Sequence, residues 1–224
     1  MSALLEYECQ APVGGYDVIT IEEPDRLHPD VAGPHIVRIL QPRSERTRRF
    51  DLFKANSSAF LEFAQTPATE DGIKAFADRY GPLFPDRPEG FHSYGRHIDR
   101  WFRPIRSMHQ LVELWKVSRW TGDFSKIIRA VQRQSNLGPH GWPVELLLKE
   151  DPLSASARLC IRPSSLVEAL WAQLILAIDG NVNLGACVQC RKWFTLEAGR
   201  GRSDKEYCSN ACRMRAYRKR KVNG

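Results

Sequence analysis

The clearest hydrophobic pattern in the chain lies between residues 164 and 181. Its apolar positions recur three and four residues apart, at Leu166, Val167, Leu170, Trp171, Leu174, Ile175 and Ile178. Ser164 or Ser165 can cap the N-terminus of such a helix, and Asp179-Gly180-Asn181 can end it. Because the apolar face is broad, we expect this helix to be buried in the core. A homodimer interface on the same face is the alternative.

Weaker patterns predict three more helices and four strands. Thr66 and Pro67 have the residue types of an N-cap and a first helical position, and they open a helix that runs to Tyr80. Pro104 opens a second helix, which carries the apolar residues Met108, Leu111, Val112 and Trp115 on one face. The third helix is predicted at Phe124–Gln134, and the strands at Tyr16–Ile21, His35–Leu40, Val144–Leu148 and Ala157–Ile161. The expected fold class is α+β, with a mostly helical body and a few short strands.

Charge is distributed unevenly along the 224 residues. The formal net charge is +7, from 33 lysines and arginines and 26 acidic residues. The segment from Cys187 to Gly224 holds 11 of the basic residues and only 3 acidic ones, so residues 1–186 are nearly neutral. The N-terminus lacks the basic region and apolar core of a secretory signal, and no apolar stretch is long enough to span a bilayer. We therefore expect a cytoplasmic protein, with no membrane contact, in which a basic module follows a neutral body.

Four of the six cysteines fall within this basic segment. Cys187, Cys190, Cys208 and Cys212 form the pattern C-x2-C-x17-C-x3-C. Disulfides are disfavoured in a reducing compartment, and two close cysteine pairs separated by 15–20 residues have the spacing of zinc ligands. Four thiolates leave zinc no open coordination position, so we expect one structural Zn²⁺ ion.

The residues between and after the two pairs predict a small treble-clef-like finger. Trp193–Leu196 is a short β-prone run, and Lys205–Tyr207 can return as a second strand. Ser209 is a suitable N-cap, and neither Gly nor Pro interrupts Asn210–Lys221, so a helix should follow the second pair. The chain is thus expected to divide into a body (1–180), a short linker (181–186) and a four-cysteine zinc finger (187–224).

The predicted C-terminal helix is unusually rich in lysine and arginine. At about 100° per residue its cations cover most of the circumference, which leaves a narrow stripe through Met214 and Tyr217 for packing. Such a density of cations beside a zinc site is typical of nucleic-acid contacts. The residues expected to make them, with DNA favoured over RNA, are Arg200, Arg202, Arg213, Arg215, Arg218, Lys219, Arg220 and Lys221. An unstructured basic tail, and contact with a protein or membrane surface, are the alternatives.

The cysteine-containing segments resemble a known zinc finger. The run from Cys187 to Phe194, followed by Tyr207-Cys208-Ser-Asn-Ala-Cys212-Arg-Met-Arg215, is similar to the bacterial CGNR-type finger. In that family the finger closes a longer N-terminal domain of the ABATE type, in proteins regarded as transcriptional regulators. The tetrad that begins at Cys212 lacks the family's Gly and Asn, so a sibling family with a similar finger is the alternative.

No enzymatic motif is found in the sequence. It contains no P-loop, nucleophile elbow or H-E-x-x-H motif. A nuclease finger would need a histidine base, and no histidine follows His140. We therefore expect a non-enzymatic, transcription-regulator-like DNA-binding factor whose body senses a ligand or mediates association. A zinc-stabilised protein–protein interaction module for an acidic partner is the alternative.

Overall fold

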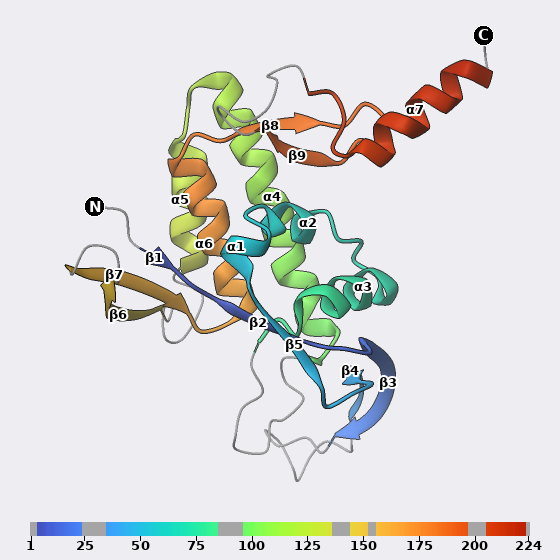
Figure 1. The fold of residues 1–224 in the computed structure, drawn as a ribbon, viewed down its shortest axis with the longest axis vertical. Helices are drawn as coiled ribbons and strands as arrows, with labels where there is room; N and C mark the ends of the chain where they lie inside the picture. The colour runs from blue at the N-terminus through green and yellow to red at the C-terminus, as the bar shows by residue number, and fades with distance from the viewer. Residues whose placement is uncertain are drawn as a thin grey trace.

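The computed structural model describes residues 4–23, 35–84, 96–135, 144–151, 156–196 and 205–222. Short strands and helices follow one another along this part of the chain, so the predicted α+β class is confirmed. The C-terminal elements β8 (Asn183–Ala186), β9 (Trp193–Leu196) and α7 (Asn210–Val222) lie together at one end of the molecule. Strands β3 (Tyr16–Glu23) and β4 (His35–Pro42) lie at the other end (Figure 1).

The strands of the body pair mainly as antiparallel hairpins. β3 (Tyr16–Glu23) pairs with β4 (His35–Pro42), and β6 (Val144–Asp151) pairs with β7 (Ser156–Pro163). These four strands contain the four that the sequence predicts. β1 (Leu4–Leu5) adds to β7 in parallel, and β2 (Glu8–Pro12) pairs with β5 (Thr47–Asp51); none of these three was predicted.

The described part of the body also contains six helices. They are α1 (Leu52–Ala55), α2 (Ala59–Ala64), α3 (Glu70–Tyr80), α4 (Asp99–Thr121), α5 (Ser125–Ser135) and α6 (Leu166–Asp179). The predicted start of α3 at Thr66-Pro67 is wrong, because Thr69 is the N-cap and its side chain accepts a hydrogen bond from the Gly72 N–H. The predicted start of α4 at Pro104 is also wrong, because this proline lies inside the helix.

The core of the body lies between α2, α4 and α6. Trp101 and Trp115 of α4 are completely buried, and Trp115 packs on Phe60 of α2 with ring centroids 6.4 Å apart. The predicted core role of α6 is confirmed, since Leu166, Leu170 and Leu174 have no exposed surface. Each fully buried side chain of this size contributes roughly 1.5–3 kcal/mol to folding.

One buried polar side chain links α6 to the chain around α2. The amide of Gln173 donates to the carbonyl oxygen of Asn56 at 2.7 Å and accepts from the Phe60 N–H at 3.2 Å. It thereby satisfies backbone groups that a buried apolar residue would leave unpaired.

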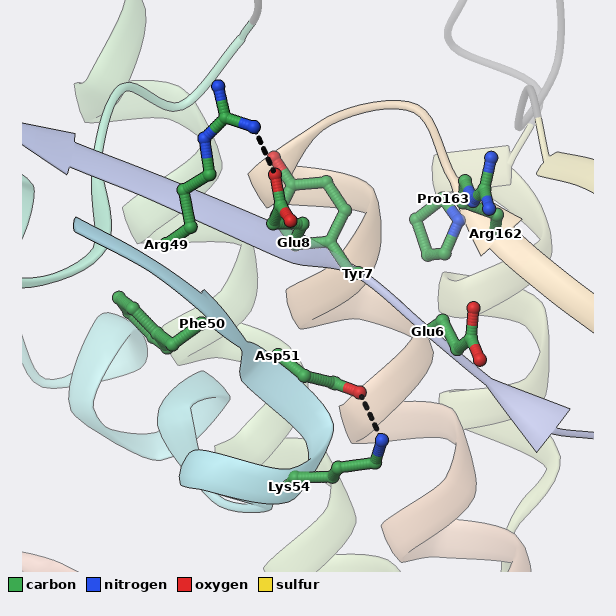
Figure 2. Close-up of a pocket in the computed structure, with 9 residues that line it drawn as sticks. All are labelled: Glu6, Tyr7, Glu8, Arg49, Phe50, Asp51, Lys54, Arg162 and Pro163. Carbon is green, nitrogen blue, oxygen red and sulfur yellow. Dashed lines mark ion pairs between the residues drawn. The ribbon is translucent and has the colours of Figure 1, made fainter. Parts of the chain in front are cut away.

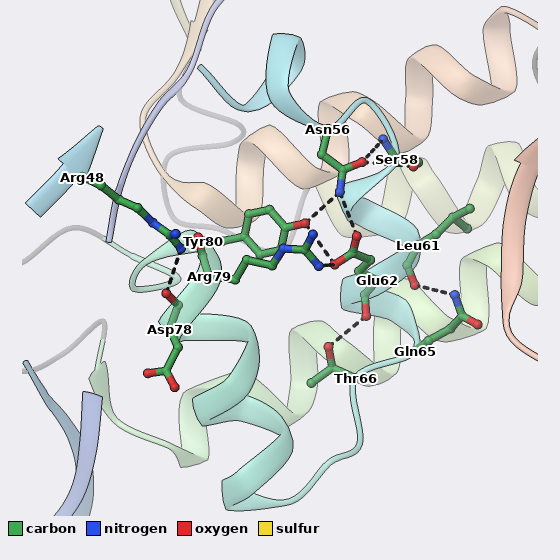
Figure 3. Close-up of polar contacts among 10 residues, drawn as sticks. All are labelled: Arg48, Asn56, Ser58, Leu61, Glu62, Gln65, Thr66, Asp78, Arg79 and Tyr80. Carbon is green, nitrogen blue, oxygen red and sulfur yellow. Dashed lines mark hydrogen bonds and ion pairs between the residues drawn. The ribbon is translucent and has the colours of Figure 1, made fainter. Parts of the chain in front are cut away.

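A carboxylate connects α2 to the end of α3 (Figure 3). The Glu62 carboxylate accepts hydrogen bonds from Arg79 at 2.8 Å, the Tyr80 hydroxyl at 3.0 Å and the Asn56 amide at 2.9 Å. These contacts fix α3 against α2, which is the helix on which the C-terminal segment docks.

Within the described ranges, no helix is both long enough and apolar enough to cross a membrane.

Candidate metal centre and nucleic-acid interface

The four C-terminal cysteines converge on one point. Their Sγ atoms all lie within 4.8 Å of one another, although the two pairs are far apart in sequence. The Sγ atom of Cys208 lies 3.6 Å from that of Cys190 and 3.6 Å from that of Cys212. The structure therefore brings together all four residues predicted as metal ligands, and the cluster can hold a metal ion.

The donor set fits a tetrahedral thiolate site. Four sulfurs each about 2.3 Å from a central zinc would lie about 3.8 Å apart, close to the separations in the cluster. Burial raises the pKa of the Cys187 thiol, but the backbone N–H groups of Cys208 and Cys190 donate to its sulfur and lower the pKa to about 6. Such N–H donors stabilise the thiolate, which is the form that binds metal.

The first cysteine pair lies in a tight turn. Strand β8 (Asn183–Ala186) pairs antiparallel with β9 (Trp193–Leu196), and the turn between them contains Cys187 and Cys190. The Arg191 N–H donates to the Cys187 carbonyl oxygen at 2.8 Å. Arg191 has a φ of 62°, a left-handed conformation that closes the turn and costs energy in a residue other than glycine.

The second pair lies at the start of helix α7 (Asn210–Val222), as predicted. The Ser209 hydroxyl accepts a hydrogen bond from the Cys212 N–H at 3.3 Å, so Ser209 is the N-cap. Cys208 precedes the cap and Cys212 lies in the first turn, so both thiols face the cluster.

The predicted strand partner of β9 is wrong. β9 pairs with β8, whereas Lys205–Tyr207 contains no strand and makes a single backbone contact to the turn, from the Val188 N–H to the Glu206 carbonyl oxygen at 3.0 Å. The segment predicted as a linker, 181–186, therefore contains β8. Gly185 of β8 pairs with Phe194 of β9, and a Cβ at this position would lie 2.8 Å from the Phe194 ring, so the close pairing requires glycine.

Trp193 attaches the C-terminal segment that carries the cysteine cluster (183–196 and 205–222, the finger) to the body. Its backbone N–H donates to the Gln65 side-chain oxygen at 2.6 Å, and its backbone carbonyl oxygen accepts from the Gln65 side-chain amide at 3.3 Å. The Trp193 indole contacts two residues of α4. It stacks on His109 with ring centroids 5.1 Å apart, and the Lys116 ammonium lies 4.7 Å from the indole centroid. No docking role for these residues was predictable from the sequence.

Arg119 holds the chain where it enters β8. Its guanidinium donates to the carbonyl oxygens of Asn181 and Val182, at 3.1 and 3.2 Å, and to the side chain of Asn183. Together with Trp193, this contact gives the finger a defined position on α2 and α4.

The residues predicted to bind nucleic acid lie mainly on α7. The helix presents six cations, all exposed: Arg213, Arg215, Arg218, Lys219, Arg220 and Lys221. Arg213 donates to the Asn210 side chain at 2.9 Å; among the described residues, the other five have no hydrogen bond or ion pair. Arg200 and Arg202 lie outside the described residues.

The expected packing stripe on α7 is wrong. Met214 and Tyr217 are 41% and 56% exposed, whereas Cys212 is buried in the cysteine cluster and Ala216, one turn further along, is partly buried. α7 extends away from the body beyond the β8–β9 hairpin (Figure 1), so none of the described helices of the body covers its outer face.

Several cations of the body, by contrast, are paired. Arg43 binds Asp17, Arg79 lies 2.8 Å from Glu62, and Lys74 lies 2.7 Å from Asp78. The Arg48 guanidinium donates to the carbonyl oxygens of Asp78 and Arg79.

A hollow of about 600 Å³ lies beside β2 and β5 (Figure 2). Its charges are mixed: Arg49 is 3.7 Å from Glu8, and Lys54 is 3.4 Å from Asp51. Such a lining has no net preference for an anion, and the strongest concentration of unpaired positive charge that the structure describes is α7.

Comparisons of this chain with protein-family models and with curated proteins found no match.

Proposed function

We propose that this protein is a zinc-stabilised nucleic-acid-binding protein, a transcription-regulator-like factor that contacts DNA through α7. The observation that carries the proposal is a projecting helix with five exposed cations that no described carboxylate neutralises. Like charges on one helix repel one another, so the arrangement is stabilised by a partner that supplies dense negative charge.

Zinc has a structural role in this proposal. Four thiolates saturate a tetrahedral ion, so the metal would offer no open position for a substrate. It would instead hold the hairpin turn against the start of α7 and thereby fix the base of the cationic helix.

A charge-removal series tests the proposal. In the full-length protein, Arg215→Gln, Arg218→Gln and Arg220→Gln together remove three charges from α7. The matched control removes three exposed cations of the body with Arg46→Gln, Arg103→Gln and Lys126→Gln. Fluorescence anisotropy with labelled duplex DNA, single-stranded DNA and RNA, each over a salt series, measures the affinity.

We expect the α7 variant to bind at least tenfold more weakly and the control to bind within about twofold of the unchanged protein. If α7 contacts about five phosphates, the log–log salt slope should lie near −4 to −5 for the unchanged protein. Equal losses in both variants, or no binding to any of the nucleic acids, would refute the proposal and favour an acidic protein partner.

A further inference from the structure

The side chains of α7 are arranged in three groups around the helix axis. Successive residues turn about 100° around the helix axis, so Tyr217, Arg218 and Lys221 all lie within about 60° of the direction of Met214. Together with Met214 they form a crest. Arg213 and Arg220 lie about 100–120° to one side, and Arg215 and Lys219 about 100–140° to the other. Cys212 and Ala216 lie about 160° away, on the back of the helix.

The burial of these residues agrees with this arrangement. The back is the covered side, because Cys212 is 6% exposed and Ala216 is partly covered. Every crest and flank residue is exposed, including the apolar Met214 and Tyr217. A crest of two apolar and two cationic side chains, exposed between two cationic flanks, is a surface that the contacts among the described residues leave unexplained.

We propose that α7 enters the major groove of duplex DNA, with its crest against the base edges and its two flanks on the phosphates of opposite strands. This inference rests on the proposed function and adds the form of the nucleic acid and the role of each face. The helix is about 20 Å long and 10–12 Å wide, and a B-form major groove is about 12 Å wide.

The two flanks favour a duplex over a single strand. A helix in a groove has one phosphate backbone on each side, so cations on both flanks can bind at once. A single strand follows one face and would leave one flank unused. Duplex RNA fits poorly, because its A-form major groove is too deep and narrow for side chains to read.

The crest has the chemistry needed to contact bases. Arg218 can donate two hydrogen bonds to a guanine edge, and the apolar surfaces of Met214 and Tyr217 can contact a thymine methyl group. Among the described residues neither Met214 nor Tyr217 packs on the cysteine-centred core, so replacing both should leave the fold unchanged.

Two double variants of the full-length, zinc-loaded protein test the inference. The crest variant carries Met214→Ala and Tyr217→Ala, and the flank variant carries Arg215→Gln and Arg220→Gln, one from each side. The probes are 20-base-pair duplex DNA of random sequence, the matching single strand, duplex RNA, and duplexes enriched by the unchanged protein from a randomised DNA library. Zinc content and circular dichroism confirm that each variant is folded.

We expect duplex DNA to bind at least fivefold more tightly than the single strand or duplex RNA. The crest variant should bind random duplex within about threefold but lose at least tenfold of its preference for enriched sequences. The flank variant should weaken binding to all duplexes and make the salt slope about 2 less steep.

Tighter binding to single-stranded DNA or to RNA would overturn the inference, as would a library without enriched sequences or a crest variant that keeps full preference. In each of these cases the charge-removal series still supports nucleic-acid binding. Absence of binding to every probe would remove the proposed function as well.

Discussion

At the residue scale, Gln65 joins the body to the finger. Its side chain pairs with both backbone polar groups of Trp193, as a neighbouring strand would. Another amide of the same length, Gln110, lies exposed on α4 and has no such contact among the described residues. The two glutamines therefore form a matched pair for measuring the docking contact.

Gln65→Ala should destabilise the zinc-loaded protein by about 1–2 kcal/mol, since it leaves the partly buried N–H of Trp193 without its acceptor. Gln110→Ala should change the free energy of unfolding by less than about 0.5 kcal/mol. Denaturant unfolding followed by tryptophan fluorescence measures both values. Equal effects would mean that the Gln65 hydrogen bonds do not contribute to docking.

Cys9 is a second residue whose environment makes a testable difference. It is 1% exposed in the core, and burial together with the Asp51 charge raises the pKa of its thiol to about 12. Replacing Cys160 by serine and loading the cluster with zinc leave Cys9 as the one thiol that is not a metal ligand. In that protein Cys9 should remain unmodified by a thiol reagent at pH 8 until denaturant unfolds the chain. Modification of Cys9 at the rate of a free thiol would contradict its burial.

The same thiol predicts how stability changes in alkali. The pKa of Cys9 is higher in the folded state than in the unfolded state. The contribution of the buried neutral thiol to the free energy of unfolding is therefore complete below about pH 8.5 and is lost as the pH rises toward 12. Between pH 7 and pH 10 the protein should lose about 2 kcal/mol that Cys9→Ala does not lose. Denaturant titrations of both proteins at the two pH values measure this difference.

At the element scale, the first turn of α7 carries Cys212 of the cysteine cluster. Cys208→Ser should abolish stoichiometric zinc binding and unfold α7, because metal binding and folding are coupled in such small modules. The helical ellipticity of the Cys208→Ser variant should fall by about the share that α7 contributes to the whole protein, while the thermal transition of the body persists. Ser209→Asp, which keeps a good N-cap, should retain both zinc and helix.

The elements that the sequence predicted well are those with local signals. α6 has a broad apolar face and the cap Ser165, and α7 has the cap Ser209, so both could be placed from sequence alone. The four cysteines were also predictable, because their spacing follows from the coordination chemistry of one ion.

Elements that depend on distant contacts were missed or misplaced. Strand β8 is four residues long, and its only local signal is Gly185, which allows the Phe194 ring to approach closely. The exposure of Met214 and Tyr217 could not be predicted either, because the cysteine cluster selects the face of α7 that carries Ala216.

At the scale of the whole molecule, finger and body have separate cores joined by a small interface. Phe194 packs with Cys187 and Cys212, while Trp193 and Leu184 pack against the body. The body should therefore fold without the finger but gain stability from it, and removing the metal should test this coupling.

Chelation of the metal should lower the melting temperature of the body by about 2–6 °C, because it removes docking contacts worth about 1–2 kcal/mol. In a Gln65→Ala, Trp193→Ala double variant the contacts between these two residues are already lost, so chelation should change the body's melting temperature by less than about 2 °C, which corresponds to the roughly 0.5 kcal/mol within which uncoupled sites are additive. Calorimetry with and without chelator on both proteins completes the cycle. An unchanged chelation effect in the double variant would place the coupling elsewhere, and loss of all cooperative unfolding would show that finger and body share one core.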